Sequence, residues 1–204
     1  MPWAPDYITG DQLADELRID DDLDDAQLAR WATAASRAVD DHCRRQFGQV
    51  DAPEARLYTP VWSKSRCAWL VPMDDLMVAP TEVAVEQYAA GVFVAVTGSV
   101  PRPLNAAQKR RPWIELALPT SAAVGTLFGR EGSVRVTGQW GWTAVPTEVK
   151  QAALLQGTRF AARRDSPYGI AGSPDTGSEL RLLAKVDPDV AVSLNGLRRK
   201  VWAR

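Results

Sequence analysis

Cysteine and histidine, the usual metal ligands, are scarce in this chain of 204 residues. Cys43, Cys67 and His42 are all that it has. A tetrahedral metal site needs about four ligands, and His42 is next to Cys43 on a predicted helix, where adjacent side chains point in different directions. Two thiols in a cytosolic chain are more often free and buried than bridged. We therefore predict no metal site, no cofactor and no disulfide.

Long hydrophobic runs are absent as well. No stretch approaches the ~20 consecutive apolar residues that a membrane span needs. The first six residues carry neither the cationic flank nor the apolar run of a secretory signal. Apolar residues make up 46% and charged residues 24% of the chain, which is typical of a globular protein that buries its own core. We expect a protein made and kept in the cytosol, with no membrane contact.

Catalytic motifs are also lacking. A nucleophile needs a base, and the single histidine, His42, lies inside a predicted helix. No serine sits in a G-x-S-x-G elbow. Gly125, Gly129 and Gly132 are not followed by the Gly-Lys-Ser/Thr of a phosphate-binding loop. The densest carboxylates stand at helix starts, where capping explains them. We predict that the chain is not an enzyme and has no catalytic residues.

Four helices are expected. Thr9 and Gln12 form a capping box before a short first helix, and Asp24 is the expected cap of the second. The second helix carries an apolar stripe at spacings of three and four: Leu28, Trp31, Ala32, Ala35, Val39 and Cys43. A third helix starts at Pro146, and Asp187-Pro188 opens a short fourth. Before it, 166–187 is rich in Pro, Gly and Ser and predicts a long loop.

The middle of the chain changes to a period of two. Val83 and Val85, the run 92–96, and the alternation of 114–118 each predict a strand, with a turn at Ala90-Gly91. In the clearest case Val134, Val136, Trp140 and Trp142 share one face. Trp140 and Trp142, with Trp31, are therefore expected in the core or in a subunit interface. We predict an α+β fold, with a small bundle of about four helices (1–55 and 143–204) and an inserted antiparallel β unit (56–142).

Charge is spread unevenly, although the formal net charge is only −1. Acidic residues crowd the N-terminal region, relieved only by Arg18: Asp11, Asp15, Glu16, Asp20, Asp21, Asp22, Asp24 and Asp25. Basic residues gather at two places: Lys109-Arg110-Arg111, and Arg198, Arg199, Lys200 and Arg204. One interpretation is a solvated surface. The other is a subunit with opposite poles, suited to ordered stacking on partners.

Six segments, in order along most of the chain, carry a family resemblance: YIT (7–9), AASRAVDDHCRRQF (34–47), VRVTGQWGW (134–142), VPTEVKQAA (145–153), RRDSPYG (163–169) and DPDV (187–190). In the order and sequence of these segments the chain resembles the head–tail adaptor (connector) proteins of long-tailed bacteriophages. The resemblance implies a helical-bundle subunit with no catalytic residues. It also implies that copies, usually twelve, form a ring beneath the portal protein at the virion neck. Such a ring extends the channel for double-stranded DNA without reading its sequence, and docks a head-completion (stopper) or tail protein.

Two site hypotheses follow from this resemblance. Acidic side chains that repel phosphates over about 10 Å suit a DNA channel wall, which would make these residues channel-lining: Asp20, Asp21, Asp22, Asp24 and Asp25. The short last helix and basic tail would order on the portal, which would make these residues portal-docking: Val190, Leu194, Leu197, Arg198, Arg199, Lys200 and Trp202.

Two other functions remain open from the sequence. The basic C-terminal tail and exposed tryptophans would suit a nucleic-acid-binding module, with salt-sensitive contacts to phosphates and stacking on bases. Trp140-Gly141-Trp142 would also suit a stacking platform for sugars in a carbohydrate-binding or hydrolytic protein. Titration with salt separates the first from a ring subunit, and oligosaccharide soaking tests the second.

Overall fold

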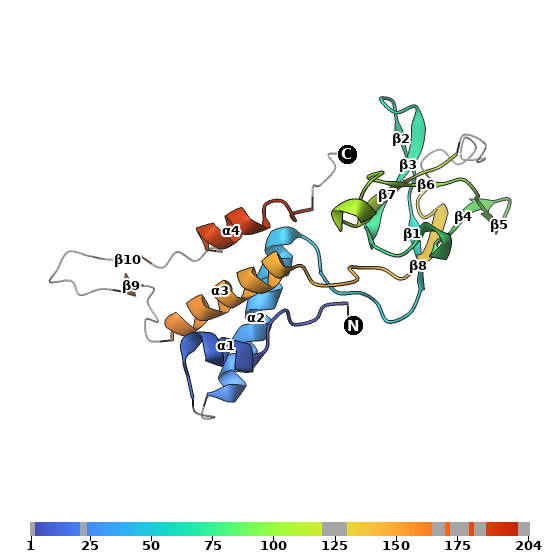
Figure 1. Ribbon diagram of the computed structural model, residues 1–204. Helices are drawn as coiled ribbons and strands as arrows, with labels where there is room; N and C mark the ends of the chain where they lie inside the picture. Colours follow the sequence, from blue (N-terminus) through green and yellow to red (C-terminus); the bar gives the residue numbers. More distant parts are fainter. Residues whose placement is uncertain are drawn as a thin grey trace. The chain divides into compact units, whose positions relative to one another are not determined.

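The chain folds into two compact units (Figure 1). The computed structural model describes residues 3–20, 24–119, 130–164, 170–171, 180–181 and 187–199. Met1–Trp3 and Gly48–Ala144 form one unit, here called the β unit, and Ala4–Phe47 and Val145–Arg204 form the other, the helical unit. Each has its own buried side chains, so each is described separately.

The expected helical bundle with one small inserted β unit is wrong. In the described part of the chain, strands dominate the middle and form two four-stranded antiparallel sheets, while four helices lie outside it. Several strands were not predicted because they are short and largely exposed, and such strands lack an alternation of apolar and polar residues. β1 (Glu54–Tyr58) is an example.

The first sheet has the strand order β1-β8-β4-β5. Besides β1 it contains β8 (Val134–Gly138), β4 (Ala84–Ala89) and β5 (Val92–Ala95), and all neighbours are antiparallel. The predicted turn at Ala90-Gly91 is confirmed. Both residues have positive φ, 48° and 94°, as a two-residue hairpin turn requires.

The second sheet has the strand order β2-β3-β7-β6. Its strands are β2 (Val61–Ser63), β3 (Ala68–Leu76), β7 (Trp113–Ala117) and β6 (Val100–Arg102). Two 3₁₀ turns, Pro80–Glu82 and Ala107–Lys109, interrupt the connections. Pro72 is tolerated in β3 because β2 pairs only with residues 68–70, which leaves position 72 with β7 alone as a ladder partner.

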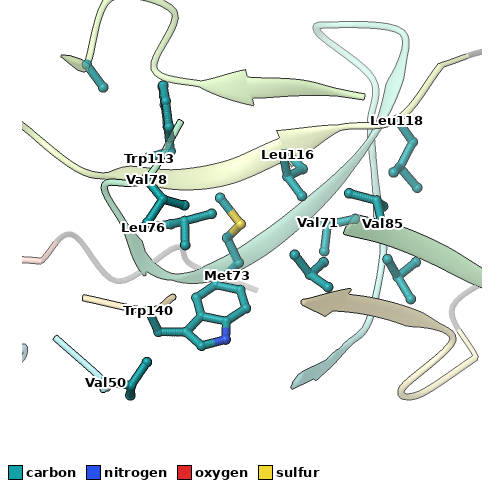
Figure 2. Packing of buried hydrophobic residues seen from close by; sticks show 13 residues of the cluster. Val50, Val71, Met73, Leu76, Val78, Val85, Trp113, Leu116, Leu118 and Trp140 are labelled. Carbon is teal, nitrogen blue, oxygen red and sulfur yellow. The ribbon is translucent and has the colours of Figure 1, made fainter. Parts of the chain in front are cut away.

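Apolar side chains from both sheets form one core, and Figure 2 shows them converging between the strands. Most are aliphatic, with Met73, Trp113 and Trp140 as the largest members; the others are Val50, Val71, Leu76, Val78, Val85, Ala106, Leu116, Leu118, Val134 and Val136. The predicted inward face of 134–142 is confirmed, since Trp140 is 0% and Trp142 2% exposed. Burial of side chains this large stabilises a core strongly.

The chain enters and leaves the β unit at a close backbone contact. The N–H of Trp142 donates to the carbonyl of Gly48 at 2.8 Å, and the N–H of Val50 donates to the carbonyl of Trp140 at 2.9 Å. Gly141, between the two tryptophans, has a φ of 112°. A Cβ at this position would lie 2.0 Å from the oxygen of Gly48, so only glycine fits here.

The helical unit contains α1 (Gly10–Leu17), α2 (Asp25–Cys43), α3 (Thr147–Ala162) and α4 (Pro188–Leu194). The predicted stripe of α2 is confirmed for five of its members, which are buried: Leu28, Ala32, Ala35, Val39 and Cys43. Trp31 is only partly buried. On α3, Gly157 allows α1 to approach, because a Cβ there would lie 3.2 Å from a methyl carbon of Leu13. A short pair of strands, β9 (Ile170–Ala171) and β10 (Leu180–Arg181), lies within the segment predicted as a loop; most of that segment is outside the described residues.

All three predicted helix caps have the expected position, and two of them make the side-chain hydrogen bond of a cap. The capping box of Thr9 and Gln12 is present, and the Asp187 carboxylate accepts from the N–H of Asp189 at 2.9 Å. Asp24 occupies the cap position of α2 but makes no capping hydrogen bond. Its carboxylate is bound by the guanidinium of Arg164 instead. A tertiary ion pair has therefore replaced the local interaction that the sequence predicted.

Candidate interaction surfaces

One end of the helical unit is acidic. Asp11, Asp15 and Glu16 are all exposed on α1, and the spacing of four puts Asp11 and Asp15 on the same helix face. Gly10 places the start of α1 against α2, because a Cβ there would lie 3.1 Å from the backbone nitrogen of Ala29. This face, called the α1 acidic face from here on, therefore lies beside the N-terminal part of α2.

The other end of α2 is basic. The helix ends at Arg44, whose φ of 54° turns the chain away, and α4 brings a distant segment to the same place. The N–H of Arg199 donates to the carbonyl of Cys43 at 2.8 Å. Four arginines thereby gather around the end of α2, and they are called the basic end: Arg44, Arg45, Arg198 and Arg199. Cations here also complement the negative end of the helix dipole.

Two titratable side chains, His42 and Cys43, lie beside the basic end, and burial is the main cause of both pKa shifts. Burial lowers the pKa of His42, and the charge of Arg198 lowers it further, so this imidazole is mainly neutral at pH 7 and adds little charge. Burial raises the pKa of the Cys43 thiol to about 12. A thiol of that pKa is a poor nucleophile, so Cys43 serves packing.

A buried polar network fastens the N-terminal segment to α2. The Tyr7 hydroxyl donates to the Asp40 carboxylate and accepts from the N–H of Phe47 at 3.0 Å. Arg37 lies 3.3 Å from the same carboxylate and donates to the carbonyl of Ala4 at 3.1 Å. Burial raises the pKa of Asp40 to about 6 despite these partners. The geometry fixes a chain segment, and nothing in it resembles a nucleophile with its base.

The β unit exposes apolar side chains near the edges of its sheets. Val61 and Trp62 on β2 are 54% and 46% exposed, and Val92 and Val94 on β5 are 60% and 46% exposed. Both strands are at a sheet edge, where unpaired backbone groups add to the capacity for contact. The predicted basic cluster Lys109-Arg110-Arg111 begins in the exposed 3₁₀ turn before β7.

The residues predicted to dock on the portal lie in different environments. Val190, Leu194 and Leu197 are buried at 0%, 0% and 3% exposure, so their side chains pack within the described chain. Arg198 is exposed and Arg199 is half-buried. Lys200 and Trp202 lie outside the described residues.

The residues predicted to line a channel are described in part. Asp20 and Asp25 are exposed, and Asp24 is half-buried in its ion pair with Arg164. Asp21 and Asp22 lie outside the described residues. The sequence did not predict the basic end as one cluster, because the end of α2 and the residues after α4 are brought together by a tertiary contact, in which Arg199 donates to the carbonyl of Cys43.

Within the described ranges, no group of three or more His, Cys, Asp or Glu side chains could hold a metal ion. Among those same residues, no helix is both long and apolar enough to cross a bilayer.

Comparison with known proteins adds no identification. No family model matches the chain, and no curated protein matches it either.

Proposed function

We propose that the chain is a structural head–tail adaptor subunit of a long-tailed bacteriophage. Copies form a ring, with twelve as the expected number, beneath the portal at the virion neck, after synthesis in the host cytoplasm. The ring extends the DNA channel and docks the next connector or tail protein. The subunit performs no catalysis and needs no cofactor.

The observation that carries this proposal is the ordered series of segments that resemble the adaptor family. The longest of these segments fall on structural elements. Residues 34–47 cover the second half of α2 and the turn that ends it, and 134–153 run from β8 through Trp140 and Trp142 into α3. Such a passage sets where the chain leaves one unit and enters the next, so it constrains the fold more than an isolated surface motif would.

Surface properties support the proposal. Exposed apolar residues on edge strands, such as Trp62 and Val92, suit contacts with other proteins. Exposed Asp20 and Asp25 suit a wall that DNA passes without adhering, since like charges repel within the screening length. Portal docking is proposed for the end of the C-terminal segment, through Lys200 and Trp202, rather than through the buried side chains of α4.

The experiment is binding to the isolated portal ring, followed by native mass spectrometry. Removing 200–204 is expected to weaken portal binding by on the order of 10-fold or more, through lost charge and contact area. The control is Lys64→Glu, which also lowers the net charge by two, at an exposed position of the β unit. Equal binding by the truncated variant and the control would contradict the docking proposal.

A second candidate, a nucleic-acid-binding module, is favoured by the basic end and by the exposed turn at Lys109 and Arg110. Contacts to phosphates would make affinity for duplex DNA fall steeply with salt, by about one power of salt concentration per phosphate contact. An adaptor subunit is expected to show weak DNA affinity at moderate salt. Tight, salt-dependent DNA binding by the isolated chain would favour this candidate instead.

A further inference from the structure

The helical unit carries charges of opposite sign at separate places. The α1 acidic face (Asp11, Asp15 and Glu16) lies beside the N-terminal part of α2 and the basic end lies at its C-terminus. From Ala29, which contacts the start of α1, to Arg44 the helix rises by about 22 Å, at about 1.5 Å per residue. Figure 1 shows α1 and the end of α2 well apart within this unit.

This separation leaves both charged places available to a partner. At ordinary salt the Debye length is about 8–10 Å, so charges about 22 Å apart on one subunit hardly attenuate one another. Asp41 is an exposed acid next to Arg44. Near the α1 acidic face, Arg18 and Arg30 are exposed bases, and Asp20 and Asp25 are further exposed acids. The exposed Arg44 and Arg198 against Asp41, and five exposed carboxylates against two arginines, leave opposite net charges at the two places.

We infer that the basic end of one copy receives the α1 acidic face of a neighbouring copy. This inference rests on the proposed ring, and it names the contact that would build it. A ring is closed by heterologous contacts, in which each copy offers two different surfaces. A two-fold dimer through either place would instead bring like charges together, which disfavours association.

A second copy fits these charges better than DNA does. Duplex DNA carries only negative charge, so it would leave the α1 acidic face without a complementary partner, and the whole chain has a formal net charge of −1. The exposed carboxylates of α1 on a second copy complement the basic end in charge. Arg44 and Arg198 are exposed at the basic end, and Asp15 and Glu16 are exposed on the α1 acidic face.

The test is a charge swap on the full chain, without the portal. One variant carries Arg44→Glu and Arg198→Glu, so that both places are acidic. The other carries Asp15→Lys and Glu16→Lys, so that both are basic. Each variant alone is expected to self-associate at least ~10-fold more weakly than the native chain in sedimentation velocity at low salt. Mixed in equal amounts, the two should associate again, because every contact then joins opposite charges.

Matched controls separate charge complementarity from damage to the fold. Lys64→Glu with Lys109→Glu reverses two exposed charges of the β unit and is expected to leave self-association unchanged. Raising salt from about 0.01 M to about 1 M shortens the Debye length from about 30 Å to about 3 Å and should dissociate the native assemblies and the mixture alike. Thermal melts confirm that each variant is folded.

Three outcomes would overturn the inference. These are a native chain that stays monomeric at low salt and high concentration, self-association that neither variant weakens, and a mixture that fails to associate although both variants are folded. If the charge-swap test fails but the chain still binds the portal, the proposed function stands and the ring is built through another contact. If the chain self-associates as expected but does not bind the portal, the contact between copies stands and the proposed function is wrong.

Discussion

Gly141→Ala is expected to cause the largest loss of stability of any single glycine-to-alanine change in the described part of the chain. The φ of 112° at this position is unfavourable for any residue with a Cβ. The added methyl group would lie 2.0 Å from the oxygen of Gly48 and 2.7 Å from the Cα of Gln49. Both contacts are with backbone, so no side chain can rotate away to relieve them.

The magnitude follows from these two effects. The backbone conformation costs about 1–3 kcal/mol. Moving Gly48 away also breaks the hydrogen bond that its carbonyl accepts from the N–H of Trp142, and a buried donor left without a partner costs about 1–3 kcal/mol. We expect a loss of about 2–6 kcal/mol in the free energy of unfolding. That is a large part of the about 5–15 kcal/mol that stabilises an ordinary domain.

The assay is urea denaturation followed by tryptophan fluorescence, with Gly91→Ala as the matched control. Gly91 also has a positive φ, 94°, but a Cβ there would meet nothing within 4 Å. The control therefore measures the conformational cost alone, about 1–3 kcal/mol. If the two variants lose the same stability, the close contact between Gly141 and Gly48 does not contribute and the reasoning is wrong.

Two further predictions concern the helical unit. Because the pKa of Asp40 is about 6 in the folded chain, above its ordinary value of 3.8, the folded state binds this proton more tightly and acidification from pH 7 to pH 4 should stabilise it by on the order of 2 kcal/mol. Asp40→Asn should remove that gain, and denaturation midpoints with the same pH dependence in both proteins would contradict it. Gly157→Leu should cost about 1–3 kcal/mol by overpacking, because a Cβ at this position already lies 3.2 Å from Leu13 and 3.4 Å from Ile8. Thermal melts check this, with Gly157→Ala as the smaller change, and a leucine variant as stable as the native chain would refute it.

Local features of the helices could be predicted from the sequence. The capping box of Thr9 and Gln12 depends only on residues three apart. The buried stripe of α2 depends only on a regular period. Asp24 shows the limit of such reasoning, since Arg164, 140 residues away in the chain, binds the carboxylate that was expected to cap α2.

The extent of the sheets could not be predicted in the same way. β3 is the longest strand of the described chain, yet Pro72, Asp74 and Asp75 give its sequence the composition of a loop. Asp75 is nevertheless 2% exposed, and its carboxylate accepts from the indole N–H of Trp142 at 2.8 Å. Tertiary partners that satisfy a buried polar group are invisible in a single-sequence pattern. The expectation of a small β insertion therefore underestimated the middle of the chain.

The basic end illustrates the same point for the surfaces. Arg44 and Arg45 were visible in the sequence as the end of a helix, and Arg198 and Arg199 as part of a basic tail. In the folded chain the N–H of Arg199 donates to the carbonyl of Cys43, which brings the two pairs together. Charge counting alone would have assigned them to separate functions.

The measurement that tests the central claim most directly is native mass spectrometry of this chain mixed with the portal ring of the same particle. An adaptor subunit is expected to give a complex with one copy per portal subunit. The absence of any complex, under conditions in which the portal ring itself stays intact, would contradict the adaptor function and leave the nucleic-acid-binding module as the function to test.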